Sequence, residues 1–193
     1  MSTPASQSPM PNHQSPLLVD RIPSPIGPIW VVTQDATLCA VDFEDCENRL
    51  LSLLQKRFGE VRLHEADNPG GVSDRLRAYL DGDLHSLDDM PTATGGTDFQ
   101  QQVWQALRTI PPGQVMTYGE LAKQLGRPKA VRAVGMTNGL NPISIVLPCH
   151  RVIGANGKLT GYAGGLARKQ WLLAHEGVTL GTVAREAQLS LLP

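Results

Sequence analysis

The sequence TYGELAKQLGRPKAVRAVGMTN, residues 117–138, decides the fold of the second half of the chain. Thr117 and Glu120 have the spacing of a capping box, so a helix is expected to begin there and to end at Gly126. A second helix is expected over residues 129–138. Two short basic helices joined by a glycine-containing turn predict a helix-turn-helix, whose second helix enters a DNA groove. Helix pairs of this size are also common packing units, so the pattern alone leaves the function open.

Another helix is expected before this pair, over residues 97–110, with Thr97 as its N-cap. Its apolar residues recur at every fourth position: Phe99, Val103 and Leu107. Pro111-Pro112-Gly113 would end it. The polar loop over residues 81–96, rich in Asp, Gly and Thr, is interpreted as a domain boundary.

The first half of the chain predicts a small antiparallel sheet with two helices. Three short stretches rich in β-branched or aromatic residues, LLVDRI, PIWVVT and LCAVDF, lie between residues 17 and 43 with turn signals between them. Helices are expected over residues 47–57 and 73–80. The predicted fold class is therefore α+β: a small N-terminal sheet-and-helix domain over residues 17–96, then a mainly helical C-terminal domain with a winged helix-turn-helix over residues 97–178.

The two ends of the chain are interpreted as tails. Residues 1–16 hold four Pro and four Ser and almost no large apolar side chains, which predicts disorder because little apolar surface offsets the ordering entropy. Residues 179–193 are taken as a C-terminal tail. No apolar stretch approaches the roughly 20 residues that cross a bilayer, and the chain does not begin with a basic segment and an apolar core. We therefore expect a cytoplasmic protein without a membrane partner.

Charge divides the chain into an acidic and a basic part. Residues 1–98 hold 7 Lys and Arg against 15 Asp and Glu, a net charge of −8, whereas residues 99–178 hold 9 against 2, a net charge of +7. Lys and Arg release counterions when they neutralise phosphates, so the basic part favours a polyanion partner. A solvated basic surface without a partner is the alternative.

Three cysteines, Cys39, Cys46 and Cys149, form an odd set at unremarkable spacing. They argue against a disulfide framework and for a reducing compartment. No His lies near Cys39 and Cys46 in the sequence, so we expect no metal and no cofactor.

Cys149 is the candidate nucleophile. An apolar run over residues 143–147, expected to be extended, leads to it. His150 and Arg151 adjoin it and acidic residues are scarce nearby, and such surroundings lower the pKa of a thiol. Side chains adjacent on a strand point to opposite faces, so a water would have to connect Cys149 with His150. An isolated cysteine is otherwise more often a small buried apolar residue.

A Cys-His-carboxylate arrangement needs a third group. Residues 99–178 contain only two carboxylates, Glu120 and Glu176. Glu120 is accounted for by its capping role.

Six sequence motifs follow one another between residues 97 and 177, and their order and spacing form one pattern: TDFQQQVWQAL, IPPGQVMTYGELA, PKAVRAVG, NPISIVLPCHRVIG, GYAGG and KQWLLAHEG. This pattern resembles the O6-alkylguanine-DNA alkyltransferase family. PCHR alone would be a modest signal, whereas six linked motifs are highly specific. The stretch SPIGPIWV, residues 24–31, is similar, more loosely, to the variable N-terminal domain of that family.

The resemblance implies direct-reversal DNA repair. An alkyl group of O6-alkylguanine, and also of O4-alkylthymine, would pass stoichiometrically to Cys149 and inactivate the protein. His150 would activate the thiol through a water, and Glu176 would orient His150. Asn141 would brace the site, and Tyr118 would help to rotate the nucleotide and donate to the base; ordinary packing is the other interpretation of Tyr118.

The implied partner is alkylated DNA, bound in its minor groove by the second helix with the damaged nucleotide flipped out. Arg132 matches the arginine finger of the family, which fills the gap in the base stack. Ala130 and Gly135 suit a close approach, and Arg151 is a further candidate DNA contact. As isolated residues, both arginines could be surface cations. The family suggests a monomer that can cluster on DNA.

The resemblance also implies a base pocket formed by Val152, Tyr162, Ala163, Gly164 and Ser144. The carbonyls of Cys149 and Val152 would accept from the guanine amino group, and residues 162–164 would close over the base. Ser144 stands where some relatives have proline, which changes the pocket wall.

Two other functions compete with repair. A lesion-binding relative would recognise damage without repairing it, but such proteins lack the reactive cysteine that is present here as Cys149. A cysteine hydrolase using Cys149, His150 and Glu176 would turn over repeatedly, whereas an S-alkylcysteine has no easy route back to the thiol.

Overall fold

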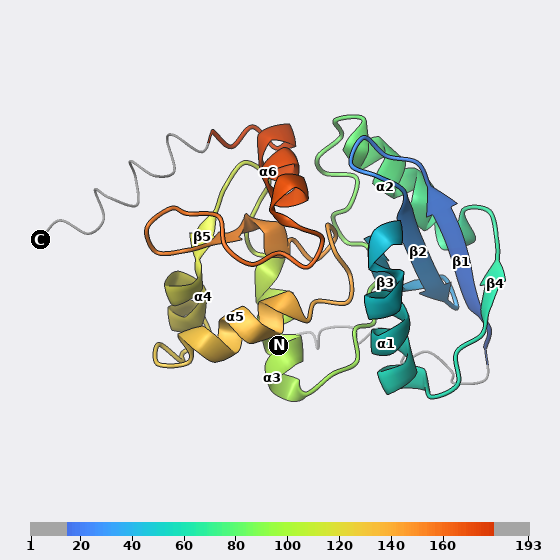
Figure 1. The fold of residues 1–193 in the computed structure, drawn as a ribbon, viewed down its shortest axis with the longest axis horizontal. Coiled ribbons are helices and arrows are strands. Elements are labelled where there is room, and N and C mark those ends of the chain that lie inside the picture. Colours follow the sequence, from blue (N-terminus) through green and yellow to red (C-terminus); the bar gives the residue numbers. More distant parts are fainter. Residues whose placement is uncertain (1–14, 180–193) are drawn as a thin grey trace, which may run out of the picture.

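The structure, a computed structural model, describes residues 15–179. Figure 1 shows two parts side by side, a sheet with helices α1 and α2 and a group of helices from α3 to α6. The predicted tails lie outside the described residues, apart from positions 15, 16 and 179. None of the described helices is long and apolar enough to cross a membrane.

The N-terminal part contains a four-stranded sheet in the order β3-β2-β1-β4. Its strands are β1 (Leu17–Ile22), β2 (Ile29–Gln34), β3 (Thr37–Phe43) and β4 (Leu63–Glu65). The three predicted strands pair antiparallel, whereas β4, which was not predicted, pairs parallel with β1. A three-residue strand carries too little pattern to be found from the sequence.

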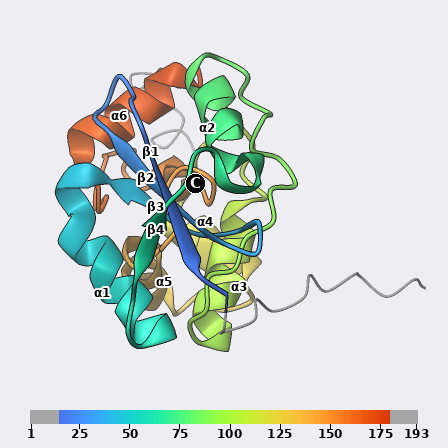
Figure 2. The ribbon, with the colours of Figure 1, turned by 90° about the vertical axis from the view of Figure 1, so that its right-hand side faces the viewer.

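Both faces of the sheet are buried, since every residue of β2 is buried and alternate residues of a strand point to opposite faces. One face packs on α1 (Glu47–Phe58) through an apolar set: Val19, Trp30, Val32, Leu50 and Leu54. The other face joins α2 (Val72–Leu80) and the C-terminal helices in a second set that includes Ile29, Val31, Phe43, Leu76 and Leu107. In Figure 2, α1 and α2 lie on opposite sides of the strands. The two parts therefore share one continuous core.

Helix α3 (Asp98–Leu107) begins at the predicted N-cap, since the Thr97 hydroxyl accepts from the backbone N–H of Gln100. It ends before the predicted Ile110, because the next three N–H groups bond carbonyls three residues back in a tight turn. On its buried side, the Trp104 indole donates to the Thr137 carbonyl at 2.9 Å. Helix α3 thereby fixes the position of α5.

The predicted helix pair is present as α4 (Tyr118–Gln124) and α5 (Val131–Gly139), which pack on each other. The capping box of Thr117 and Glu120 is formed in both directions. Two short strands, β5 (Met116–Thr117) and β6 (Val152–Ile153), pair in parallel beside it. Helix α6 (Leu166–His175) is the last element of this part. The predicted fold class is confirmed.

Candidate active site and nucleic-acid interface

The segment that leads to Cys149 is a buried turn. The N–H of Leu147 donates to the carbonyl of Ile143 at 3.0 Å, and Ile145 has a φ of 72°. The Asn141 amide completes the turn: its Nδ2 donates to the Leu147 carbonyl at 2.7 Å, and its Oδ1 accepts from the Ile143 N–H at 3.0 Å. The prediction of an extended run was wrong because a short apolar run does not by itself distinguish a strand from other buried segments.

This turn is docked on the outer edge of β3. The N–H of Val41 donates to the Pro142 carbonyl at 3.0 Å, and the N–H of Ser144 donates to the Val41 carbonyl at 2.9 Å. Leu38 pairs in the same way with the segment over residues 91–93. The N-terminal sheet therefore carries the backbone that positions the candidate nucleophile.

Cys149 opens a 3-10 turn, η3 (Cys149–Arg151), so the strand geometry expected for neighbouring side chains does not apply. Cys149 and His150 are both buried. Burial raises the pKa of the Cys149 thiol, while a hydrogen bond from Asn141 and the charge of Lys169 oppose that rise. Because the first effect is larger, the thiol needs a base in order to ionise.

His150 and Glu176 are in direct contact. His150 Nε2 lies 2.9 Å from Glu176 Oε1, and both side chains are fully buried. Burial lowers the pKa of His150, and the Glu176 carboxylate partly opposes this. His150 Nδ1 has no hydrogen-bond partner within the described residues. It is therefore the ring nitrogen left to exchange a proton.

Glu176 accepts four hydrogen bonds. Arg151 donates from Nε to Oε2 at 2.9 Å and from Nη2 to Oε1 at 2.7 Å. The Tyr79 hydroxyl donates to Oε1 at 2.6 Å, the same oxygen that contacts His150. Burial alone would raise the pKa of Glu176, but His150 and Arg151 outweigh it and hold that pKa well below its usual value. Glu176 is therefore a carboxylate at neutral pH.

The prediction that Arg151 contacts DNA is wrong. Its side chain is 9% exposed, and its third nitrogen, Nη1, donates to the Ile110 carbonyl at 2.5 Å. Each of the three guanidinium nitrogens of Arg151 donates to a group inside the protein, two of them in parallel to Glu176. Arg151 is thus part of the support of Glu176.

Lys169 is a site residue that the sequence analysis missed. It is fully buried, and its Nζ donates to the carbonyls of Val152 at 2.6 Å and Thr160 at 2.8 Å. Burial lowers its pKa to about 8, while the neighbouring Cys149 acts in the opposite direction. The signal was its position three and four residues before Leu172 and Leu173, which places it on the buried face of α6.

The variant Lys169→Met should make Cys149 harder to ionise. Loss of the buried charge removes a group that favours the thiolate, so the pH midpoint for alkylation of Cys149 by iodoacetamide should rise by about half a unit or more. Peptide mass mapping after timed labelling would follow Cys149 alone. Lys158→Met is the matched control, since Lys158 is exposed in the loop between β6 and α6. Equal midpoints in the two variants would contradict the effect of the buried charge.

The surface of α4 and α5 combines cations with apolar side chains. Its exposed cations are Lys123, Arg127, Lys129 and Arg132. Its exposed apolar residues are Val131, Met136 and Leu140, of which Met136 is 72% exposed. Arg132 therefore lies at the surface. A convex helix with this mixture suits a groove lined by phosphates.

Tyr118, at the start of α4, lies between this surface and the site. Its hydroxyl donates to the Thr160 carbonyl at 3.3 Å. Gly135 faces the Tyr118 ring, and a Cβ at that position would lie 3.8 Å from it, an ordinary van der Waals contact. Ala130, at the N-cap of α5, is half-buried.

The two carbonyls expected to bind a base each accept one donor already. Asn138 Nδ2 donates to the Cys149 carbonyl at 3.3 Å, and Lys169 occupies one site of the Val152 carbonyl. Each carbonyl oxygen has a second lone pair and can still accept. Ser144 is buried in the turn.

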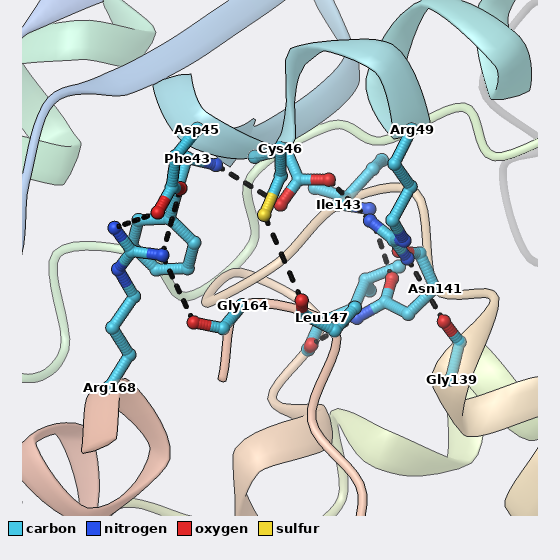
Figure 3. A network of polar contacts seen from close by, with 12 residues as sticks. Phe43, Asp45, Cys46, Arg49, Gly139, Asn141, Ile143, Leu147, Gly164 and Arg168 are labelled. Carbon is cyan, nitrogen blue, oxygen red and sulfur yellow. Dashed lines mark hydrogen bonds and ion pairs between the residues drawn. The ribbon is translucent and has the colours of Figure 1, made fainter. Parts of the chain in front are cut away.

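Arg168 of α6 links the loop with Tyr162, Ala163 and Gly164 to the N-terminal part. Figure 3 shows Arg168 donating to the Gly164 carbonyl at 3.0 Å and to both oxygens of Asp45. The guanidinium also lies 4.2 Å over the Phe43 ring. A Cβ on Gly164 would come within 2.5 Å of that ring, so only glycine fits there.

Arg49 makes a second bridge between the two parts. It pairs with buried Asp42 and donates to the carbonyls of Gly139 at 3.0 Å and Asn141 at 2.8 Å (Figure 3). The end of α5 and the turn before Cys149 are thereby tied to α1. Among residues 15–179, no group of three or more His, Cys, Asp or Glu could hold a metal ion.

Two family models match the chain. The model described as "6-O-methylguanine DNA methyltransferase, ribonuclease-like domain" matches residues 18–94, and the model described as "6-O-methylguanine DNA methyltransferase, DNA binding domain" matches residues 98–178.

Curated proteins and solved structures agree with these matches. The chain is 57% identical over 168 residues to the methylated-DNA–protein-cysteine methyltransferase of Shigella flexneri, covering 85% of this chain and 98% of the relative. It is 47% identical to the protein of the same name from Mycobacterium bovis, covering 80% and 89%. The crystal structure of Mycobacterium tuberculosis OGT in complex with DNA is similar with a TM-score of 0.73 and 41% identity, covering 86% of this chain and 98% of that chain.

Proposed function

The chain belongs to the 6-O-methylguanine DNA methyltransferase family, and from this premise we propose that Cys149 is the residue that accepts the alkyl group. The protein binds DNA and repairs it by direct reversal, moving an alkyl group from O6-alkylguanine to one of its own cysteines. The observation that carries the assignment is the buried contact of His150 with Glu176 beside Cys149.

All three thiols have a raised pKa, so what separates the other two cysteines from Cys149 is the lack of a neighbouring base. Cys39 is buried within β3, and burial raises the pKa of its thiol more than Arg57 lowers it. Cys46 is half-buried, and burial together with the charges of Asp42 and Asp45 raises the pKa of its thiol. Neither of them adjoins a histidine in the sequence. Cys149 is therefore the thiol with a base at hand.

The proposed reaction is a displacement at the alkyl carbon. The Cys149 proton passes through a water to Nδ1 of His150, and Glu176 stabilises the imidazolium through Nε2. The sulfur then forms a bond to the alkyl carbon while the bond from that carbon to guanine O6 breaks, and its electron pair stays on the base. A proton delivered to the base, with the Tyr118 hydroxyl as donor, lets guanine leave as a neutral molecule. The product is a thioether without an easy route back to a thiol, so each molecule acts once.

The proposed DNA interface is the surface of α5. The helix would lie in the minor groove with its small residues, Ala130 and Gly135, close to the backbone of the DNA. Arg132 would enter the stack in place of the damaged nucleotide, which flips toward Cys149 because a stacked base cannot reach a buried thiol. Residues 162–164 and Ser144 would enclose the flipped base. Exposure of Arg132 and burial of Cys149 support this arrangement.

Arg132→Ala should slow transfer from duplex DNA about 10- to 100-fold, because the variant cannot offset a few kcal/mol of unstacking. Transfer from a single-stranded oligonucleotide should fall far less. The measurement is the single-turnover rate on both substrates at saturating DNA. Lys129→Ala, which removes an exposed cation next to α5, is the control and should keep the duplex rate. Equal losses on duplex and single strand would remove Arg132 from the flipping step.

The test of the proposed function is intact mass spectrometry after mixing the protein with excess O6-methylguanine DNA. We expect one added methyl group per molecule, located on Cys149 by peptide mapping, and no further demethylation when fresh DNA is added. Free product beyond one per protein would indicate a hydrolase, and bound DNA with an unchanged protein mass would indicate a lesion-binding protein. The same assay with O4-methylthymine DNA tests the second substrate.

The proposed unit of action is a monomer whose two domains are residues 17–96 and 97–178. The opposite charges of the acidic and basic parts support clustering of such monomers along DNA, since one part can face the other in neighbouring molecules. Sedimentation velocity with and without DNA tests both statements.

A further inference from the structure

We propose that Tyr79, on the N-terminal helix α2, is a positioning residue that sets how strongly Glu176 holds the proton of His150. The proposal rests on the function proposed above for Cys149, His150 and Glu176, and it adds a residue from the other part of the molecule. Tyr79 acts through Glu176 and does not touch the reacting atoms.

The contact is short and buried. The Tyr79 hydroxyl lies 2.6 Å from Glu176 Oε1, the shortest of the four bonds to that carboxylate. Tyr79 is fully buried. Burial, followed by the Glu176 charge, raises the pKa of Tyr79 far above its usual value, so the phenol keeps its proton and donates it at all ordinary pH values. A donor to a buried carboxylate forms a charge-assisted bond of the stronger kind.

Tyr79 and His150 donate to the same oxygen. Arg151 already orients the carboxylate through its two parallel bonds, one to each oxygen. The hydroxyl of Tyr79 is therefore not required to hold the carboxylate in place. The hydroxyl of Tyr79 instead weakens the negative charge that Oε1 presents to the imidazole. A hydrogen bond to the charged form of an acid lowers the basicity of that acid's carboxylate.

Tyr79 is itself fixed by packing between α2 and α6. His175 Nε2 donates to the Tyr79 carbonyl at 2.7 Å, and the two rings meet edge to face with centroids 5.3 Å apart. The His175 ring stacks in turn on Trp171 at 4.8 Å. The edge-to-face ring contact, which a phenylalanine at position 175 can also make, thus orients the hydroxyl from outside the active site.

The electrostatic surroundings of His150 come from several elements. The nearest charges are Glu176, at the end of α6, and Arg151, in the same turn as His150. The other titratable groups near His150 are Lys169 of α6 and Cys149. Tyr79 is the donor that α2 supplies. Removing its hydroxyl leaves more charge on Oε1, which favours the imidazolium, so the pH at which His150 loses its proton should rise.

The experiment is Tyr79→Phe in the full chain. The pKa of His150 is read from an NMR titration of the histidine ring signals, with His150→Gln used to assign the signal. We expect the midpoint to rise by about half a unit or more. Because a neutral His150 has to accept the thiol proton, the rising limb of the pH–rate profile for methyl transfer should move to higher pH by the same amount.

Two further variants separate this role from stability. His175→Phe loses the bond to the Tyr79 carbonyl but keeps the ring and the Tyr79 hydroxyl, so it should lower the unfolding midpoint and leave the His150 titration unchanged. Site-specific 3,5-difluorotyrosine at position 79 is a stronger donor and should move the His150 midpoint to lower pH. This second variant also decides the question if Tyr79→Phe does not fold.

A folded Tyr79→Phe protein with the wild-type His150 midpoint would overturn the proposal, and so would an equal shift in His175→Phe. A difluorotyrosine shift of zero or upward would also overturn it. The titration needs neither DNA nor methyl transfer. The titration therefore tests the role of Tyr79 independently of the mass measurement, which tests Cys149 as the acceptor.

Discussion

Cys149→Ser should bind alkylated DNA and transfer no alkyl group. The hydroxyl fits the space of the thiol, but it ionises only at far higher pH and His150 cannot make it a comparable nucleophile. We therefore expect no detectable transfer within a time about a thousand-fold longer than the wild-type protein needs. The measurement is the intact mass after prolonged incubation with excess O6-methylguanine DNA, together with the affinity for the same DNA.

The matched control is the double variant Cys39→Ser and Cys46→Ser, which keeps Cys149 as the sole cysteine of the chain. It should take up one methyl group per molecule at the wild-type rate. A methyl group on the Cys149→Ser protein, or none on the double variant, would place the acceptor elsewhere.

Glu176→Gln should have the second-largest effect, on both stability and rate. The amide leaves the Arg151 guanidinium without a counter-charge, and its NH₂ group faces donors where the carboxylate had accepted. Breaking a buried ion pair costs about 3–5 kcal/mol. Loss of the group that stabilises protonated His150 should lower the transfer rate about 10²- to 10⁴-fold. Urea unfolding and single-turnover kinetics measure the two effects.

Glu176→Gln should also change how the stability of the protein depends on pH in acid. The pKa of Glu176 in the folded protein lies below its unfolded value of 4.5, so its stabilising contribution is present above pH 4.5 and is lost as pH falls through the lower, folded value. Glu176→Gln should lack this part of the acid dependence. Glu120→Gln is the control, because Glu120 is exposed and glutamine preserves the capping box. If the two variants behaved alike, Glu176 would have no special role.

Local signals were read correctly from the sequence. The capping box at Thr117 and the N-cap at Thr97 depend on residues three positions apart, so the spacing contains the whole interaction. Glu176 could be singled out as a partner of His150 because carboxylates are scarce in the basic part and because the motif resemblance pointed to it. The structure brings the two side chains together at 2.9 Å.

Long-range contacts between buried polar groups could not be read in this way. Arg151 and Lys169 resemble surface cations in composition, since Lys and Arg are rarely buried without partners. Their partners are assembled only by folding, and Tyr79 stands 97 positions from Glu176. The turn before Cys149 was missed for a related reason, because the hydrogen bonds of the Asn141 amide, rather than apolar periodicity, define it.

The docking of the active-site turn on β3 has a consequence for the whole molecule. β3 is an outermost strand of the sheet, and an uncovered edge strand offers unpaired backbone groups to other chains. Residues 91–93 and 142–144 cover that edge here. A substitution that removes the hydrogen bonds of the turn, for example at Asn141, would therefore expose an aggregation-prone edge strand. The backbone segment that positions the repair cysteine therefore also protects the protein from aggregation through the edge of β3.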